Sequence, residues 1–163
     1  MIPIFVVDAF TDGPFTGNPA GVCLLEGPAD DHWMQAVAAE MRHAETAFLW
    51  PEGDGYRLRW FTPAVEVDLC GHATLAASRA LAELGQLADG AEVVFLTRCG
   101  ELRAARRGTR FELDFPLTPA EPIDPPSQYS SKLAGVTLVH RLRVVTALCG
   151  FTRITAGEPG DAR

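Results

Sequence analysis

The chain has 163 residues, of which 47% are hydrophobic, and a formal net charge of -7 from 21 acidic and 14 basic residues. This length suits one ordinary domain with an extension, and this composition excludes wholesale disorder. The acidic balance, without a lysine- or arginine-rich run, argues against nucleic acid as the main partner.

The N-terminal third alternates apolar runs with turn-forming residues. Ile2 to Phe10 predicts a buried strand rather than a signal peptide, because basic residues and a cleavage site are missing. A loop rich in Gly, Pro, Asp and Asn follows from Thr11 to Pro19, and Ala20 to Leu25 predicts a second strand. Asp30 or Asp31 can cap a helix that continues to about Met41. Its expected inward stripe is Trp33, Ala36, Val37 and Met41.

A hairpin and an unusual helix come next. Glu45 to Trp50 and Gly55 to Phe61 predict two strands joined by the turn over 51–55. After a turn at Thr62-Pro63 and a second short strand, Cys70-Gly71-His72 opens a helix over residues 73–84. In that helix only Thr74, Ser78, Arg79 and Glu83 are polar and the rest is Ala and Leu. It should therefore be enclosed nearly all round, so we expect a curved sheet wrapped around it.

The start of this helix has a chemical use. The first N–H groups of a helix lack partners within it and carry a partial positive charge, which suits a carboxylate or a phosphate. Gly71 removes a side chain that would block approach, and His72 adds a titratable donor. The alternative is that Gly71 only makes a tight turn and His72 only caps the helix.

The second half continues as a meander and then changes character. Three strands are predicted, over residues 92–97, 100–106 and 109–115, and the arginines among them suit a solvated hairpin face. The proline-rich stretch over 116–126 predicts a linker. Residues 127–163 contain one expected strand region, 136–148, and are too few for an independent core. We therefore divide the chain into a lobe with its linker, 1–126, and a C-terminal tail, 127–163.

Cysteine usage and hydropathy indicate the compartment. The four cysteines, at positions 23, 70, 99 and 149, form no CxxC pair and no cysteine–histidine cluster at metal-ligand spacing. Such thiols are typical of a reduced cytoplasmic protein without a bound metal. No apolar run reaches the ~18 residues of a membrane span, so no membrane partner is expected.

Four strings resemble one family, the phenazine-biosynthesis PhzF-like proteins, relatives of diaminopimelate epimerase. They are VDAFTDGPFTGNPAGV at 7–22, AETAF at 44–48, RWFTPAVEVDLCGHATLAA at 59–77 and FELDFP at 111–116, in the family's order and spacing. The resemblance implies an α+β fold, in which a mixed β-sheet is rolled around a central α-helix. It also implies a cofactor-independent isomerase or epimerase that moves a proton on a small carboxylate-bearing metabolite.

The resemblance assigns roles to individual residues. Glu45 matches the family's acid/base carboxylate and His72 its active-site histidine, while the backbone at Gly71 and His72 matches a grip for the substrate carboxylate. Taking a proton from carbon needs a strong base, which a carboxylate becomes when it is buried. Asn18, in the GNP motif, matches a substrate-side loop, although an Asx-turn before Pro19 explains it equally well. Cys70 matches a catalytic thiol of the epimerase relatives, but buried cysteine is commonly just a small apolar residue.

Family members have two such lobes with the active site between them, and residues 127–163 do not resemble a second one. We expect a truncated form first, without the opposing acid that a complete site uses. Pairing of two chains as a homodimer would instead rebuild a two-lobed site. The rival class is a non-catalytic module that binds carboxylates or oligomerises. Half of a two-lobed protein should expose an apolar face, which favours association.

Overall fold

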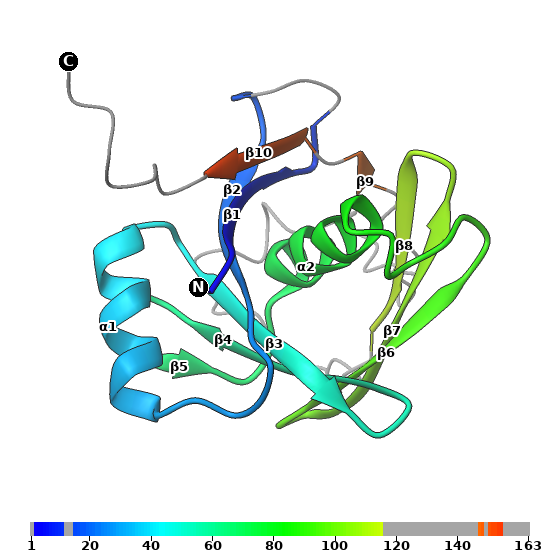
Figure 1. The fold of residues 1–163 in the computed structure, drawn as a ribbon. Coiled ribbons are helices and arrows are strands. Elements are labelled where there is room, and N and C mark those ends of the chain that lie inside the picture. Colours follow the sequence, from blue (N-terminus) through cyan, green and yellow to red (C-terminus); the bar gives the residue numbers. More distant parts are fainter. Residues whose placement is uncertain (1, 12–14, 116–146, 149, 155–163) are drawn as a thin grey trace, which may run out of the picture.

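One mixed sheet forms most of the computed structural model, which describes residues 2–11, 15–115, 147–148 and 150–154. Along the sheet the strands follow the order β10-β1-β2-β3-β4-β6-β7-β8-β9, and β5 adds to β4 (Figure 1). The pairs β2–β3 and β4–β6 are parallel and the remaining pairs are antiparallel. In chain order the elements are β1 (Ile4–Ala9), β2 (Asn18–Leu24), α1 (Asp31–Met41), β3 (Thr46–Glu52), β4 (Gly55–Phe61), β5 (Glu66–Val67), α2 (Gly71–Glu83), β6 (Glu92–Thr97), β7 (Gly100–Arg107), β8 (Arg110–Asp114), β9 (Ala147–Leu148) and β10 (Gly150–Ile154).

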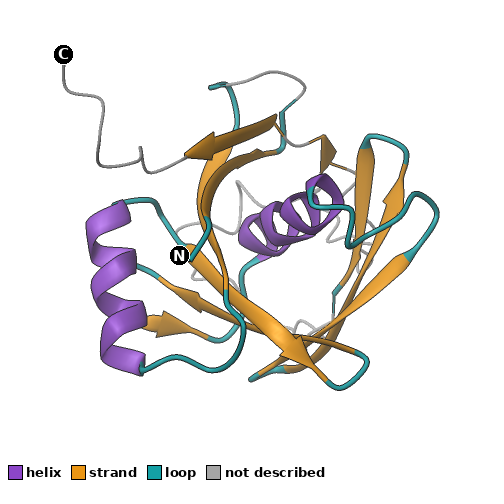
Figure 2. Cartoon of the chain, viewed as in Figure 1, coloured by secondary structure: helices purple, strands orange, loops and turns teal. Residues whose placement is uncertain are grey.

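Helix α2 lies inside the curve of this sheet, as Figures 1 and 2 show, and contacts β1, β2, β3, β7 and β8. Its eight buried residues are Ala73, Thr74, Leu75, Ala76, Ala77, Ser78, Ala80 and Leu81. The two buried hydroxyls among them are satisfied within the helix, since each donates to a carbonyl four residues earlier, at 2.6 and 2.8 Å. The predicted α+β fold, a mixed sheet rolled around one central helix, is confirmed.

The two faces of β3 meet different cores. Ala47 and Leu49 belong to the core around α2, whereas Phe48 and Trp50 belong to a second core under α1. This alternation is the two-residue period of a strand. An odd-numbered residue at the start of β3 is therefore directed to the α2 side.

Helix α1 begins as predicted, because the Asp30 carboxylate accepts the Trp33 N–H at 3.1 Å. Its predicted stripe is confirmed in part, since Trp33 and Val37 are partly buried and pack against the second core. Met34 and Ala38 are the buried residues and Ala36 is exposed. The predicted stripe Trp33, Ala36, Val37 and Met41 left out Met34 and Ala38. Packing on β3 and β4 instead selects the i, i+4 pair one position further along the chain.

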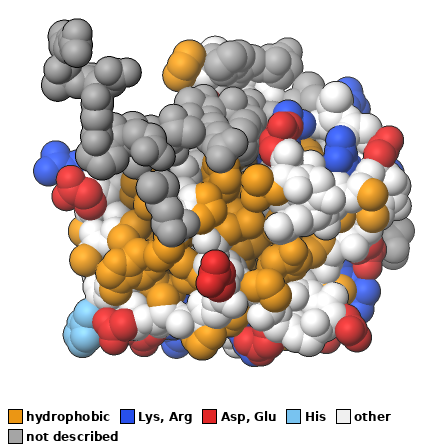
Figure 3. Space-filling view, viewed as in Figure 1, with side chains coloured by type: hydrophobic (Ala, Val, Ile, Leu, Met, Phe, Trp, Pro, Cys, Tyr) orange, Lys and Arg blue, Asp and Glu red, His pale blue; other side chains and the backbone are white. Residues whose placement is uncertain are grey.

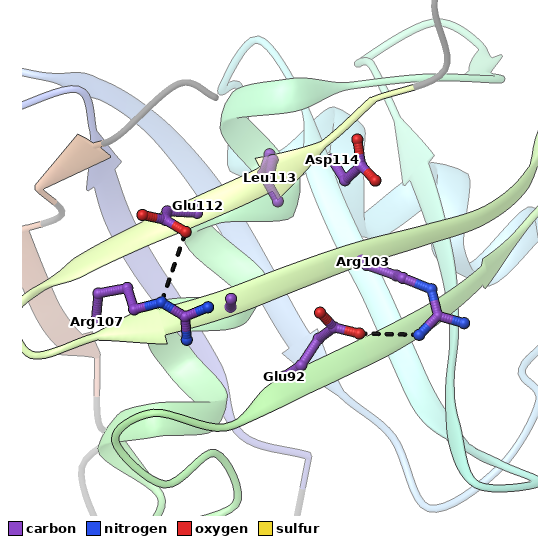
Figure 4. Close-up of a pocket in the computed structure, with 7 residues that line it drawn as sticks. Glu92, Arg103, Arg107, Glu112, Leu113 and Asp114 are labelled. Atoms are coloured by element: carbon purple, nitrogen blue, oxygen red, sulfur yellow. Dashed lines mark hydrogen bonds and ion pairs between the residues drawn. The ribbon is translucent and has the colours of Figure 1, made fainter. Parts of the chain in front are cut away.

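The outer face of β6, β7 and β8 carries the arginine cluster that the sequence assigned to solvent. Figure 4 shows Arg103 beside Glu92 and Arg107 beside Glu112, with nitrogen–oxygen distances of 2.8 and 3.6 Å. Asp114 lines the same shallow depression. These half-exposed pairs contribute little stability each. Their mixed charges are those of an ordinary solvated sheet face.

The described part of the C-terminal tail belongs to the sheet. β9 pairs with β8, and β10 pairs antiparallel with β1 in the register Ile4↔Ile154. The linker and residues 136–146 of the expected strand region lie outside the described residues, whereas β10 was not predicted. The chain over 147–154 therefore contributes to both edges of the sheet. Within the described residues, neither helix is long and apolar enough to cross a membrane.

Candidate active site

Glu45 immediately precedes β3 and occupies the row that faces α2. Its carbonyl accepts the Gly21 N–H of β2 at 3.2 Å, which fixes the backbone at the point where β2 and β3 begin to pair. The side chain is 21% exposed. A carboxylate is thus held at the rim of the α2 core rather than in open solvent.

His72 faces that carboxylate from the first turn of α2. Its Nε2 lies 3.3 Å from Oε2 of Glu45, and the imidazole is only 11% exposed. Nε2 is buried and makes no aligned hydrogen bond among the described residues. The N-cap of α2 is Cys70, so the alternative in which His72 itself caps the helix is wrong. The fold brings together the two residues that the sequence predicted as catalytic.

Burial lowers the pKa of His72 below its ordinary value, although the negative charge of Glu45 acts in the opposite direction. The imidazole is therefore neutral at neutral pH. A neutral ring keeps one N–H donor and one acceptor nitrogen, so it can pass a proton or orient a carboxylate.

Lowering the pH should destabilise the fold, because protonation of His72 favours the unfolded chain. As the pH falls below about 6.5, the unfolded chain binds a proton at this residue before the folded chain does. The contribution of the neutral imidazole to the free energy of unfolding is complete above about pH 6.5. It is lost as the pH falls through the lowered pKa of His72 in the folded state. Urea unfolding at about pH 7.5 and about pH 5 measures it. His72→Gln should unfold with a shallower pH dependence than wild type, and His32→Gln, on the exposed face of α1, should keep the wild-type slope. Equal slopes in all three proteins would contradict the assignment.

Cys70 is the third polar group of this cluster. Its Sγ lies 3.4 Å from Nδ1 of His72, and ligand atoms of Glu45, Cys70 and His72 all lie within 4.8 Å of one another. Burial raises the pKa of the thiol to about 12, the Ala73 N–H opposes this rise, and the charge of Glu45 adds to it. Cys70 is a protonated thiol at neutral pH rather than a ready nucleophile.

Gly71 has a close aromatic neighbour. A Cβ added at Gly71 would lie 3.1 Å from the ring of Phe115, which follows β8. That spacing is tighter than ordinary carbon contacts, so glycine allows the aromatic ring to pack beside the start of α2. Sequence reasoning gave Phe115 no part in the site, although it lies in the quoted FELDFP motif. Its position depends on the pairing of β7 with β8, which no local pattern specifies.

Asn18 is the first residue of β2, opposite Ala9 in the β1 register, and is exposed. It begins the strand that lies parallel to β3, at the same end of the sheet as Glu45. No described interaction of its side chain joins it to Glu45 or His72. Its substrate-binding role stays a prediction.

Comparison with known proteins identifies relatives across most of the chain. The family model described as phenazine biosynthesis-like protein matches residues 7–155, which continues past Pro116, where the quoted motifs end. An uncharacterized isomerase of Halalkalibacterium halodurans is 58% identical over 114 residues, covering 70% of this chain and 43% of that protein. A human phenazine biosynthesis-like domain-containing protein is 46% identical over 131 residues, covering 76% and 45%.

Solved structures agree with the fold. A PhzF-family protein of Enterococcus faecalis matches with a TM-score of 0.71 and 40% identity, over 80% of this chain and 50% of that chain. A protein of Agrobacterium radiobacter described as a probable proline racemase, at 18% identity and a TM-score of 0.53, shares the fold alone. The chain spans a little under half the length of the curated relatives named above.

Proposed function

Because the chain belongs to the phenazine biosynthesis-like (PhzC-PhzF) protein family, we propose that it catalyses a cofactor-independent isomerisation or epimerisation of a small carboxylate-bearing metabolite. The observation that carries this proposal is the 3.3 Å approach of the Glu45 carboxylate to the neutral His72 imidazole at the start of α2. The isomerase names of curated relatives support the reaction class. The substrate class rests on the helix terminus and on the family resemblance.

The arrangement suggests a division of labour. The Glu45 carboxylate takes the proton from a carbon atom near the substrate carboxylate and returns it to another position or to the opposite face. His72 donates a hydrogen bond to the developing charge or to Glu45. The N–H groups at Gly71 and His72 hold the substrate carboxylate at the positive end of α2. Each role uses a group already present in the chain, so the chemistry needs no cofactor.

Solvent deuterium exchange tests the proposal directly. We expect the purified protein, incubated in D₂O with a panel of small amino acids and unsaturated carboxylic acids, to incorporate deuterium at a carbon position. The rate should scale with protein concentration and should persist after treatment with a chelator. Incorporation that requires an added cofactor would contradict the proposal. Binding of these acids without exchange would favour the non-catalytic carboxylate-binding module.

We further propose that the chain self-associates through the end of the sheet beside the site, where β1 and β4 finish and β2 and β3 begin. Thr46 at the start of β3 pairs with Phe61 at the end of β4, so the turn after β4 also lies at this end of the sheet. Four large apolar side chains in the loops at this end of the sheet are 45 to 87% exposed: Phe10, Phe15, Val65 and Leu69. Separately from the loop after β1, which lies at the top of this view, Figure 3 shows hydrophobic side chains gathered over the middle of the face. Such a surface is typical of an interaction site.

Phe15→Ser should therefore weaken a homodimer. Phe15 is the most exposed of the four, at 87%, and burying its ring is worth roughly 1.5–3 kcal/mol, or about 10- to 100-fold in the dimer dissociation constant. Light scattering over a concentration series measures the change. Leu84→Ser, at the opposite end of α2, is the matched control, since Leu84 is also exposed, at 40%. A wild-type protein that stays monomeric throughout would refute the dimer.

A further inference from the structure

We propose that Glu45, Cys70 and His72 form a binding site for Zn²⁺ or another borderline-soft divalent ion. One ligand atom from each of the three residues lies within 4.8 Å of the others. A carboxylate oxygen, a thiol sulfur and an imidazole nitrogen are the donor types that zinc takes in proteins. The site goes beyond the proposed isomerase activity, although it uses side chains of the same cluster.

The donors are close to the spacing that a metal needs. Ligand bonds of about 2.0–2.3 Å place neighbouring donors of a tetrahedral zinc roughly 3.3–3.7 Å apart. Oε2 of Glu45 and Nε2 of His72 are already 3.3 Å apart. The sulfur of Cys70 is 3.4 Å from the other nitrogen of the same ring. Because the three ligand atoms already lie within 4.8 Å of one another, small side-chain rotations would bring them to zinc-ligand distances.

The surroundings favour a metal over the alternatives. Nε2 of His72 is buried and makes no aligned hydrogen bond with the described residues, so coordination would give it a partner. Ca²⁺ and Mg²⁺ need many oxygen ligands, whereas this cluster offers one carboxylate, one sulfur and one nitrogen. Three protein ligands leave a fourth position for water, and the thiol proton passes to the solvent as the metal binds.

The sequence predicted no metal because Cys70 and His72, two residues apart, match no common ligand spacing. The third donor, Glu45, precedes β3 and comes close to the other two only because the sheet folds around the start of α2. A metal held here would occupy Glu45 and would stop the proposed proton transfer. That inhibition rests on the proposed function, whereas binding itself does not.

Cobalt substitution tests the site without a substrate. The full chain, free of any affinity tag and of metal, is titrated with Co²⁺ as a spectroscopic probe. We expect a thiolate-to-cobalt absorption band in the near ultraviolet, visible bands of tetrahedral intensity, and loss of both on adding Zn²⁺. Cys70→Ser should abolish the near-ultraviolet band and weaken Zn²⁺ binding at least about 10- to 100-fold, a cost typical even of outer-shell changes. Cys99→Ser, an exposed thiol, should retain both properties.

Three outcomes overturn the proposal at once. These are a wild-type protein without cobalt bands, a near-ultraviolet band that survives in Cys70→Ser, and bands that vanish in Cys99→Ser. Circular dichroism checks that each variant is folded. If Cys70→Ser does not fold, Glu45→Gln decides, because it should keep the thiolate band and lose at least about tenfold in Zn²⁺ affinity. Undiminished affinity in Glu45→Gln refutes the three-ligand site. Failure of deuterium exchange in the wild type leaves these readings unaffected.

Discussion

Replacing Glu45 by glutamine should lower the rate of solvent deuterium exchange about 100- to 10,000-fold, the range that a positioned acid/base group contributes. Glutamine keeps the shape of the side chain and its ability to hydrogen-bond His72. It removes the basic oxygen that would accept a proton from carbon. The loss should appear in the exchange rate rather than in the affinity for the acid, because the helix terminus that holds the carboxylate is unchanged.

The matched control is Glu40→Gln, on the exposed face of α1. It removes the same negative charge at an exposed position outside the candidate site, so it separates a local role of Glu45 from an effect of net charge. We expect Glu40→Gln to exchange at the wild-type rate. If Glu45→Gln exchanged as fast as Glu40→Gln, Glu45 would have no part in the mechanism, and the function would return to a binding module.

Leu81→Ala should destabilise the fold by about 2–5 kcal/mol. Leu81 is fully buried near the C-terminal end of α2, in the core that the rolled sheet encloses. Removing it opens a cavity that a helix surrounded by strands has little freedom to fill. Because a domain of this kind is stable by only about 5–15 kcal/mol, the loss is a large fraction of the total. Urea unfolding with an unchanged m-value would report it.

Leu84→Ala is the control for this prediction, since Leu84 is the C-cap of the same helix and is 40% exposed. The two substitutions remove the same atoms, so the difference between them measures enclosure. We expect Leu84→Ala to change the free energy of unfolding by about 0.5 kcal/mol or less. Similar costs at both positions would mean that α2 is not enclosed in solution.

Local pattern was enough for most of the elements. The run of Ala and Leu after His72 implied a helix buried on all sides, and α2 is buried in that way. The hairpin before it and the meander after it were placed from turn residues such as Gly53, Gly100 and Gly108, all of which have positive φ. Local chemistry decides these features, so the sequence states them directly.

Other features depended on long-range pairing. The phase of α1 on Met34 and Ala38 is selected by the strands beneath it, and several apolar residues in that helix competed for the same role. The strand β10 exists because β1 offers it an edge. Phe115 reaches Gly71 only because β8 pairs with β7. Neighbours that are distant in the chain leave no local signal.

By itself the sequence determined which residues carry chemical groups, Glu45, Cys70 and His72 among them, and that a helix opening with Gly71 lies inside a sheet. Tertiary structure alone decided that the imidazole lies 3.3 Å from the carboxylate and 3.4 Å from the thiol. The reason is physical: side-chain identity and helix burial follow from local composition, whereas a distance between a strand and a helix follows from how the whole sheet closes around its core.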